Sequence, residues 1–403
     1  MSLTSRAHRS RGAAALAVVA LLFAGCDAGS SDASEAADAT DTASGSPSAE
    51  AQPAEVSVNV ARGAADVPVS TVVKVDASNG RLTKVKVTSA EGELPGKISD
   101  DGARWAAEDR LEPGVDYTVE AVAASTSGER TRRTSSFTTQ ALTLDQQTYP
   151  SVAPLDGETV GVGMPVIVSF DVAVSDRAAM EKNMTVTSTP AQAGTWHWIS
   201  DNEVHWRPKK YWQAGTEVHV EADVNGVDAG GGIYGQEDRV VDFTIGDAHI
   251  YKVNAQTHQM KVYSNGKLVN TFPITTGKEG FTTRSGTKVI MEKFDSKRMN
   301  SETVGIPQGS SESYDIDNVQ WAMRLTSSGE FIHAAPWSVG SQGYANVSHG
   351  CTGMSTADAG WLYSMSVRGD VVEYTGTDRP MEPENGYGDW NIGYADYKAG
   401  SAL

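Results

Sequence analysis

The stretch His333-Ala-Ala-Pro-Trp-Ser-Val-Gly-Ser-Gln-Gly-Tyr-Ala-Asn-Val-Ser-His-Gly-Cys351 carries the most specific chemical signal in the sequence. Acyl transfer by a thiol needs a base that takes up the thiol proton and N–H donors that stabilise the developing oxyanion. Gly350 permits a tight turn beside Cys351, and such turns aim consecutive backbone N–H groups at one point. The stretch therefore predicts Cys351 as a nucleophile.

The base that serves this nucleophile has two candidates. His333 ends an apolar, strand-like run 18 residues before Cys351, whereas His349 lies only two residues before it. A side chain two residues away is poorly placed for direct contact between imidazole and thiol, which favours His333. The run Ser355-Thr-Ala-Asp358 predicts the start of a helix soon after Cys351, and a nearby helix N-terminus is expected to favour the thiolate.

The first residues have the pattern of a bacterial export signal. A basic segment precedes the apolar run Ala13–Ala24, whose 12 residues are too short for a membrane span of about 20. The run Leu22-Phe-Ala-Gly-Cys26 resembles a lipobox, with Phe23 in place of the preferred Leu. This resemblance implies a signal peptide over 1–25 and a lipid on Cys26 that anchors the protein to the extracytoplasmic face of the membrane. An ordinary secretory signal is the alternative.

Cysteine usage supports a reactive Cys351. The sequence has two cysteines, and if Cys26 carries a lipid then Cys351 has no partner. An unpaired thiol in an exported protein is either inert or reactive. In the segment 26–53, the residues after Cys26 include no Val, Leu, Ile, Phe, Tyr or Trp, which predicts an acidic, flexible tether.

Two blocks of alternating apolar and polar residues follow, over 54–146 and 147–247. Short alternating runs separated by turn residues are typical of β-sandwiches. The blocks also repeat: Trp105, Gly114 and Val119 recur as Trp206, Gly215 and Val220, each 101 residues later. A repeat of this length predicts two duplicated immunoglobulin-like domains.

The second block contains a cluster of aromatic residues, for which two interpretations remain open. A glycan-binding platform is one, and the core of the sandwich with its domain interface is the other and the more common. The residues are Trp196, Trp198, Trp206, Tyr211 and Trp212.

The third block, 248–376, predicts a further mostly-β domain with one main helix. Met260-Lys-Val-Tyr263 and Leu268-Val269 flank an Asn265-Gly266 turn, which predicts a hairpin. The helix is expected to begin at Ser355 and to stop at Gly369. The remaining segment, 377–403, is rich in Gly and Tyr, and Trp390 is expected to pin this C-terminal tail back onto the third domain.

The motif around Cys351 resembles the signature of the L,D-transpeptidase (YkuD-like) family. His333, 14 intervening residues and Ser348-His-Gly-Cys351 fit that signature, and the whole layout resembles the mycobacterial lipoprotein branch with two immunoglobulin-like domains. The resemblance implies a mainly-β fold with two immunoglobulin-like sandwiches followed by an L,D-transpeptidase catalytic domain. It also implies that Cys351 forms a thioacyl-enzyme with peptidoglycan tetrapeptide stems, releases D-Ala and makes 3→3 cross-links. No cofactor is implied, and carbapenems are expected inhibitors.

The resemblance also assigns further positions. The backbone N–H groups of His349, Gly350 and Cys351 would form the oxyanion hole. The positions expected to contact substrate are Tyr314, Met299, Ser328, Gly329, Phe331, Trp337, Ser348 and Gly353. For Met299, Phe331 and Trp337, plain core packing is the alternative. At Ala334, which replaces a common Ser, only the backbone carbonyl is needed to orient His333.

The chain departs from the family pattern after the nucleophile, where Thr352 and Gly353 replace a hydrophobic residue and an Asn. The absence of that Asn removes one amide that would contact the donor substrate or order the loop. In the second block, Gly231 replaces an acidic ligand of a loop that can bind Ca²⁺ in relatives, so no metal is expected.

The net charge of −18 argues against nucleic acid as a partner. The family resemblance implies peptidoglycan stem peptides as partners, and the lipobox resemblance implies a membrane. Three competing functions remain: a wall-binding lipoprotein with weak or lost catalysis, an L,D-carboxypeptidase that uses water as acceptor, and a sortase-like ligase. Sortases typically pair Cys and His with an Arg and lack Ser-His-Gly-Cys, which disfavours the last.

Overall fold

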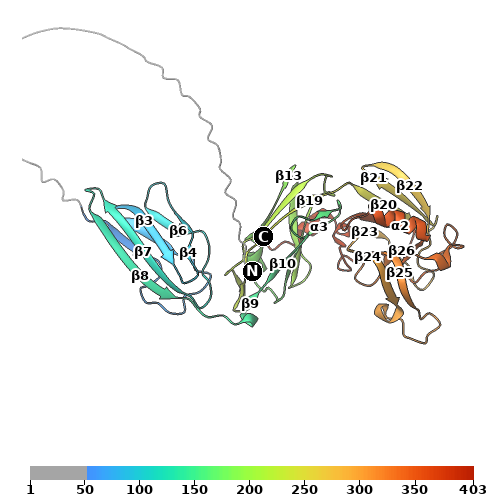
Figure 1. Cartoon of the computed structure of the whole chain (residues 1–403), viewed down its shortest axis with the longest axis horizontal. Coiled ribbons are helices and arrows are strands. Elements are labelled where there is room, and N and C mark those ends of the chain that lie inside the picture. Colours follow the sequence, from blue (N-terminus) through green and yellow to red (C-terminus); the bar gives the residue numbers. More distant parts are fainter. Residues whose placement is uncertain (1–51) are drawn as a thin grey trace, which may run out of the picture. The chain divides into compact units, whose positions relative to one another are not determined.

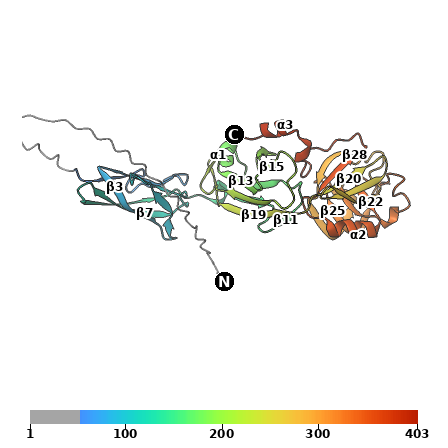
Figure 2. The same ribbon diagram turned by 90° about the horizontal axis from the view of Figure 1, so that it is seen from above.

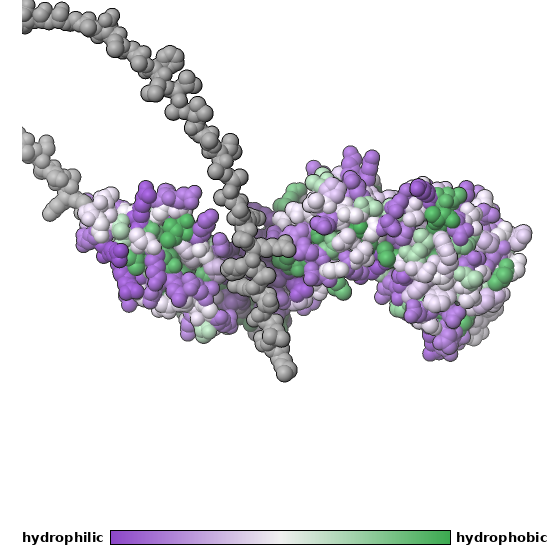
Figure 3. Space-filling model, turned by 45° about the horizontal axis from the view of Figure 1, so that its top comes forward, coloured by the Kyte–Doolittle hydropathy of each residue, from purple (hydrophilic) through white to green (hydrophobic). Residues whose placement is uncertain are grey.

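The computed structural model describes residues 52–403, and the predicted signal peptide, the Cys26 lipid site and nearly all of the tether lie outside this range. The described chain is mostly β, with immunoglobulin-like sandwiches followed by a mixed-sheet domain (Figure 1), which confirms the predicted fold class. None of its helices is both long and apolar enough to cross a membrane. Hydrophilic residues dominate the face seen in Figure 3.

The first sandwich has two four-stranded sheets around one core. One sheet has the order β1 (Glu55–Val58), β2 (Lys74–Ser78), β6 (Arg104–Ala107), β5 (Gly96–Ile98). The other has the order β4 (Glu93–Leu94), β3 (Gly80–Thr88), β7 (Asp116–Ser125), β8 (Arg130–Thr138). Strict alternation along β7 buries every second side chain, as the period-2 pattern predicts. Tyr117 stacks on Phe137 in this core, with ring centroids 5.4 Å apart.

The second sandwich has the same kind of architecture. One sheet has the order β10 (Pro150–Ala153), β12 (Val166–Phe170), β15 (Glu203–Pro208), β14 (Gly194–Trp198). The facing sheet has the order β11 (Thr159–Val160), β19 (Arg239–Ile245), β16 (Glu217–Ala222), β13 (Met184–Thr189). A small sheet of β17 (Asp228–Gly230), β18 (Ile233–Gly235) and β9 (Gln147–Thr148), the 3-10 turn η1 (Leu144–Gln146) and the short helix α1 (Arg177–Glu181) complete it.

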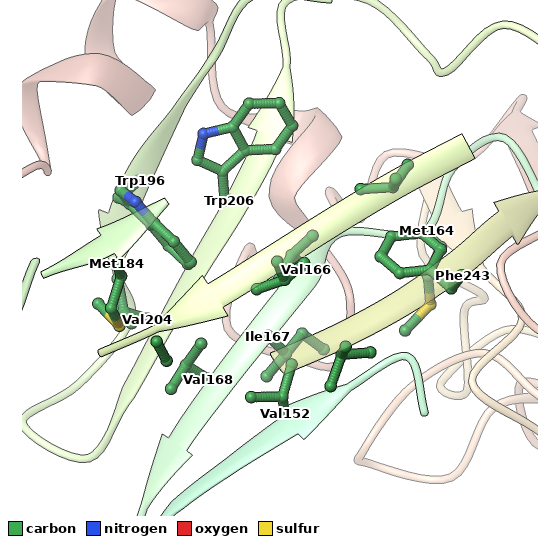
Figure 4. Close-up of a cluster of buried hydrophobic side chains, with 14 of the residues drawn as sticks. Val152, Met164, Val166, Ile167, Val168, Met184, Trp196, Val204, Trp206 and Phe243 are labelled. Carbon is green, nitrogen blue, oxygen red and sulfur yellow. The ribbon is translucent and has the colours of Figure 1, made fainter. Parts of the chain in front are cut away.

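The aromatic cluster of this sandwich is core. Trp196, Trp198, Trp206 and Trp212 are all buried, and Trp206 stacks on Trp212 with ring centroids 5.3 Å apart. Trp196 and Trp206 lie among the aliphatic side chains of the sheets (Figure 4). Four buried indoles leave no exposed platform of these residues, so the glycan-platform interpretation is wrong for them.

The duplicated pattern corresponds to equivalent turns and strands. Trp105 and Trp206 are buried on β6 and β15, and Val119 and Val220 are buried on β7 and β16. Gly114 and Gly215 precede β7 and β16 with φ of 70° and 78°. A side chain is strained in that conformation, which explains why glycine occupies both places.

The third domain is built on two sheets that enclose a core of its own. The first has the order β22 (Lys267–Pro273), β21 (Gln259–Ser264), β20 (His249–Asn254), β28 (Val371–Thr375), β23 (Gly286–Val289). The second has the order β24 (Glu292–Asn300), β25 (Asp315–Arg324), β26 (Phe331–Ala334), β27 (Thr352–Met354). The 3-10 turns η2 (Ser301–Val304) and η3 (Pro336–Ser338) lie in the connections. The predicted Asn265-Gly266 turn joins β21 to β22, with positive φ at both residues.

The predicted main helix is α2 (Thr356–Met365). Its N-cap is Ser355, whose Oγ accepts a hydrogen bond from the Asp358 N–H at 3.1 Å. The helix ends at Met365, earlier than the predicted stop at Gly369, because Ser366 is already extended. Ala359 and Leu362 pack into the core of the third domain.

The C-terminal tail contains the 3-10 turn η4 (Asp389–Asn391) and the helix α3 (Tyr394–Ala399), seen in Figure 2 near the C-terminus. The prediction that Trp390 pins the tail to the third domain is wrong. Its indole N–H donates to the Gly163 carbonyl at 2.7 Å, and the Arg207 guanidinium lies 4.7 Å from its ring centroid. Both partners belong to the second sandwich, in which Gly163 and Arg207 are buried.

Candidate active site

Cys351 follows a turn that its neighbours order closely. The Ser348 hydroxyl donates to the Cys351 carbonyl at 2.6 Å and accepts from the Gly350 N–H at 3.1 Å. The Thr283 hydroxyl donates to the Gly350 carbonyl at 2.8 Å. Gly350 has a φ of +121°, a conformation that side chains disfavour. Ser348 therefore fixes the turn in which Gly350 is required.

Parallel pairing brings His333 and Cys351 together. Strand β27 begins one residue after Cys351 and pairs in parallel with β26, so that His333 lies opposite Gly353. Neighbouring strands are about 4.8 Å apart. His333 and Cys351 line one cavity of about 270 Å³. The two residues that the sequence singled out are thus neighbours in space.

His333 is held as a neutral base. Its side chain is buried, and Nδ1 lies 2.8 Å from the Ala334 carbonyl oxygen. A carbonyl only accepts hydrogen bonds, so Nδ1 carries the proton and Nε2 keeps a lone pair. Burial lowers the pKa of His333, although the bond to Ala334 opposes this shift. The predicted orientation by the Ala334 backbone carbonyl is confirmed.

The Cys351 thiol is protonated at rest. Burial raises the pKa of Cys351 to about 11, against the effect of the Phe331 backbone N–H. The Sγ atom lies 3.6 Å from the Gly329 carbonyl oxygen, to which it donates. Burial thus opposes the thiolate that the nearby helix N-terminus is expected to favour, and β27 lies between Cys351 and α2 in the chain. A base must therefore remove the proton as the thiol attacks.

The oxyanion donors differ from those predicted in one position. The Gly350 N–H is already used by the Ser348 hydroxyl. The N–H groups of His349 and Cys351 have no acceptor within residues 52–403. These two groups can therefore bind a developing oxyanion at the turn, and Gly350 contributes its backbone conformation.

His349, the rival base, is occupied elsewhere. Its Nε2 lies 2.7 Å from the Glu312 carboxylate, which also accepts from the Lys278 ammonium at 2.6 Å. The His349 ring packs edge-on against Phe281 and lies 5.2 Å from the Tyr314 ring centroid. The imidazole thus ties the segment that carries Glu312 and Tyr314 to the Cys351 turn.

Two cavities meet at Cys351. The first is also lined by Met299, Tyr314, Trp337, Ser348, His349 and Gly353. The second, of about 300 Å³, is lined by Met299, Tyr314, Gly329, Phe331 and Cys351 among others. Burial raises the pKa of Tyr314 to about 12, so its hydroxyl remains a donor near the thiol. Two openings onto one thiol suit a reaction with two substrates.

Three of the predicted contact residues have individual environments. Trp337 is 56% exposed, so it is not core, and its ring lies 5.9 Å from that of His333. Phe331 is buried and also lines the second cavity, so packing and contact coexist there. Ser328 lines neither cavity, because Asn385 of the tail binds both its N–H and its hydroxyl.

Sequence reasoning missed the charged residues behind the turn. Lys288, Glu330 and Arg284 are buried together, and Glu330 accepts from both cations. The available signal was a charge at the start of each of two apolar strand-like runs, Lys288 before Val-Ile-Met291 and Glu330 before Phe-Ile-His333. Sequence reasoning also missed Glu312, which lies two residues before Tyr314.

Comparisons with known proteins agree with this architecture. A family model of a bacterial immunoglobulin domain matches residues 64–228, and a model of the L,D-transpeptidase catalytic domain matches residues 248–373. L,D-transpeptidase 2 of Mycobacterium tuberculosis is 38% identical over 89% of this chain and 87% of its own length. L,D-transpeptidase 5 of the same organism is 33% identical over 84% of this chain and 75% of its own length.

A solved structure is also similar. It is that of an L,D-transpeptidase in complex with imipenem, 37% identical, with a TM-score of 0.50 over 56% of this chain and 97% of that chain. The identity to the mycobacterial enzymes extends across the sandwiches as well as the third domain. This chain belongs to the L,D-transpeptidase family.

Proposed function

We propose that this protein is a peptidoglycan L,D-transpeptidase that forms 3→3 cross-links through a thioacyl-enzyme on Cys351. The observation that carries the proposal is the parallel pairing of β26 with β27, which sets a neutral His333 beside the Cys351 thiol in one cavity. That geometry suits a concerted proton transfer, because a protonated thiol faces an unprotonated imidazole.

In the first half-reaction, His333 Nε2 takes the thiol proton while Sγ attacks the carbonyl between the third stem residue and the terminal D-Ala. The N–H groups of His349 and Cys351 bind the oxyanion. The carbon–nitrogen bond then breaks, and His333 returns the proton to the amine of the leaving D-Ala. A thioester to Cys351 remains.

In the second half-reaction, the side-chain amine of the third residue of a second peptidoglycan stem attacks the thioester. His333 takes the amine proton and gives it to Cys351 as the carbon–sulfur bond breaks. The product is an amide between two third residues, and the thiol is regenerated. The second cavity gives the acceptor a route to Cys351 separate from that of the donor.

The substrate and location follow from the same proposal. We place the enzyme on the extracytoplasmic face of the membrane, held by a lipid on Cys26, where peptidoglycan stems are available. β-Lactams are proposed to acylate Cys351, since a related structure is a complex with imipenem. A Cys26→Ala variant released from the membrane fraction supports the anchor, and one that stays there refutes it.

The test of the reaction uses a defined disaccharide tetrapeptide and mass spectrometry. The expected products are a thioester adduct on Cys351, free D-Ala and a 3→3 dimer, all lost in Cys351→Ala. A tripeptide without any dimer identifies an L,D-carboxypeptidase instead. A folded wild-type protein that forms neither adduct nor product, and no carbapenem adduct, identifies a wall-binding protein.

A further inference from the structure

A buried group of charged side chains lies behind the Cys351 turn. Lys288 on β23 is completely buried, and Arg284 and Glu330 are each less than a tenth exposed. Lys288 Nζ forms an ion pair with Glu330, whose other oxygen accepts from Arg284 Nη1 at 2.9 Å. The Arg284 backbone N–H also donates to Glu330, at 3.2 Å. We call Lys288, Arg284 and Glu330 the buried charge cluster.

The buried charge cluster is in contact with the residues that carry the nucleophile. A Cβ placed on Gly350 would lie 3.6 Å from Glu330 Cγ, so the carboxylate side chain packs directly against the turn. Lys288 Nζ lies 3.7 Å from the centroid of the Tyr374 ring. The Tyr374 hydroxyl is 2.6 Å from the Thr352 hydroxyl, on the residue that follows Cys351.

The cluster has an excess of positive charge. Two buried cations share the one buried carboxylate of Glu330, and the second partner of Arg284, Glu382, is substantially exposed. Burial of an ammonium is costly, and a buried ion pair is often replaceable by apolar residues without loss of stability. The stability of the fold therefore does not explain a lysine at position 288. A second anion besides Glu330, the thiolate of Cys351, would explain it.

Cys351 faces charged and titratable groups from several elements. They are Lys288 of β23, Arg284 before it, Glu330 and His333 at β26, Tyr374 of β28, and Tyr314 and His349 across the cavity. Glu330 acts to raise and Lys288 to lower the pKa of Cys351. Among these groups, Lys288 is a fully buried cation, linked to the residue after Cys351 through Tyr374 and Thr352.

We propose that Lys288 is a positioning residue whose buried cation, held by Glu330 and Tyr374, stabilises the negative charge that develops on Cys351 Sγ. The proposal deepens the proposed function and rests on it, since the thiolate forms as Cys351 attacks an acyl donor and again as it leaves. His333 moves the proton in both steps, and Lys288 neither gains nor loses one. The cation acts on sulfur through space and does not touch the substrate.

The test compares four full-length variants by the rate at which iodoacetamide alkylates Cys351 at pH 7. Lys288→Met removes the charge and keeps the length of the chain. Lys288→Gln removes the charge but keeps an N–H donor to Glu330. Lys288→Arg keeps the charge. Lys252→Met is the matched control, because Lys252 is an exposed lysine of the same domain that pairs with Glu373.

We expect Lys288→Met and Lys288→Gln to slow alkylation about tenfold, since one nearby charge shifts a thiol pKa by about one unit. Lys288→Arg should restore the wild-type rate, and Lys252→Met should not change it. Burial lowers the pKa of Lys288 to about 8, so Lys288 loses its charge above that pH. The difference in alkylation rate between wild type and Lys288→Met should therefore narrow above pH 8.

Two results overturn the proposal. One is a wild-type rate in Lys288→Gln, which assigns Lys288 a hydrogen-bonding role alone. The other is an unchanged rate in a folded Lys288→Met. If Lys288→Met does not fold, the comparison of Lys288→Gln with Lys288→Arg decides. Alkylation needs no peptidoglycan, so a charge effect without any cross-linking refutes the proposed function and leaves this inference intact.

Discussion

Gly353 lies so close to Thr275 that a Cβ on Gly353 would be 2.9 Å from Thr275 Cγ2, and 3.0 Å from the Ala335 Cβ. The Asn that the family usually carries at this position therefore does not fit beside this threonine. The two residues also exchange backbone hydrogen bonds, of 3.1 and 2.9 Å, that join the segment after β22 to β27 at the cavity wall. Thr275 thus occupies part of the space that an Asn side chain would fill.

Substituting Gly353→Asn alone should therefore reduce activity. We expect a destabilisation of about 1–3 kcal/mol from overpacking and a slower carbapenem adduct on Cys351. Chemical denaturation and mass spectrometry measure the two effects. The double variant Thr275→Ser/Gly353→Asn removes the crowding methyl, keeps the hydroxyl that bonds the Ala345 carbonyl and the Val347 N–H, and should recover stability. Full stability of the single variant would contradict the crowding.

Replacement of the base should abolish acylation and spare the fold. In His333→Gln, no basic nitrogen remains to take the thiol proton, which at a pKa of about 11 is fully present at neutral pH. We expect the acylation rate to fall by about 10²–10⁴, the usual contribution of a general base. Stopped-flow acylation by a carbapenem measures it, with circular dichroism to check the fold. A loss of fold without a change in the rate per folded molecule would make His333 structural.

The pH profile of acylation should show the lowered pKa of His333. Burial keeps the imidazole neutral below its ordinary value of 6.5, so the acid limb of the profile should lie below that pH. The same shift contributes stability that is present above pH 6.5 and is lost as the pH falls through the acid range. An acid limb above pH 7 would contradict the burial of this base.

The buried pair of His205 and Asp389 should give stability the opposite pH dependence. Burial disfavours the His205 cation, but Asp389 and Glu203 outweigh it and raise the pKa of His205 to about 9. This contribution is complete below pH 6.5 and is lost as the pH rises through about 9. Thermal unfolding between pH 6 and 10 should show the loss in wild type.

Asp389→Asn is the matched variant for that experiment. It removes the charge that holds the His205 proton, at a nitrogen–oxygen distance of 2.9 Å, and keeps the shape of the side chain. We expect a loss of about 3–5 kcal/mol at pH 6, the usual cost of breaking a buried pair, and a flatter profile above pH 7. A variant as pH-dependent as wild type would place the titrating group elsewhere.

The ionic contacts of Glu312 with Lys278 and His349 should support binding of the acyl donor. Lys278 and His349 both bind this carboxylate and lower its pKa below the ordinary value. In Glu312→Gln, the segment that carries Tyr314 loses its ionic contact with the Cys351 turn, so donor capture should weaken several-fold and become less dependent on salt. Acylation rates at two ionic strengths measure this, and Glu302→Gln, on an exposed turn of the same segment, is the control.

The strands and the Cys–His pair were predictable because local pattern controls them. Alternation specifies the faces of β7, and the Asn265-Gly266 turn specifies the β21–β22 hairpin, in each case through residues close in sequence. The spacing of His333 and Cys351 was informative because it fits a known signature. The orientation of His333 by Ala334 needs only the adjacent peptide.

The contacts that were not predictable join residues far apart in the chain. Trp390 binds Gly163, 227 residues away, and no local pattern distinguishes this partner from the third domain. The pairing of Lys288 with Glu330 depends on which apolar runs become neighbours. The state of the thiol likewise depends on burial, which overrides the nearby helix that the sequence made conspicuous.

The parallel ladder between β26 and β27 positions the base and the nucleophile, whereas other residues supply part of the wall of the first cavity. The backbone hydrogen bonds of that ladder set the spacing of base and nucleophile, whereas the intervening segment from Ala335 to Gly350 walls the first cavity with Trp337 and Val347. Substitutions at Trp337 or Val347, away from the Ser348–Gly350 turn, can therefore change which substrates enter without moving the two reacting atoms. An enzyme built this way can acquire a new substrate preference through changes in one connection, while its chemistry is inherited unchanged.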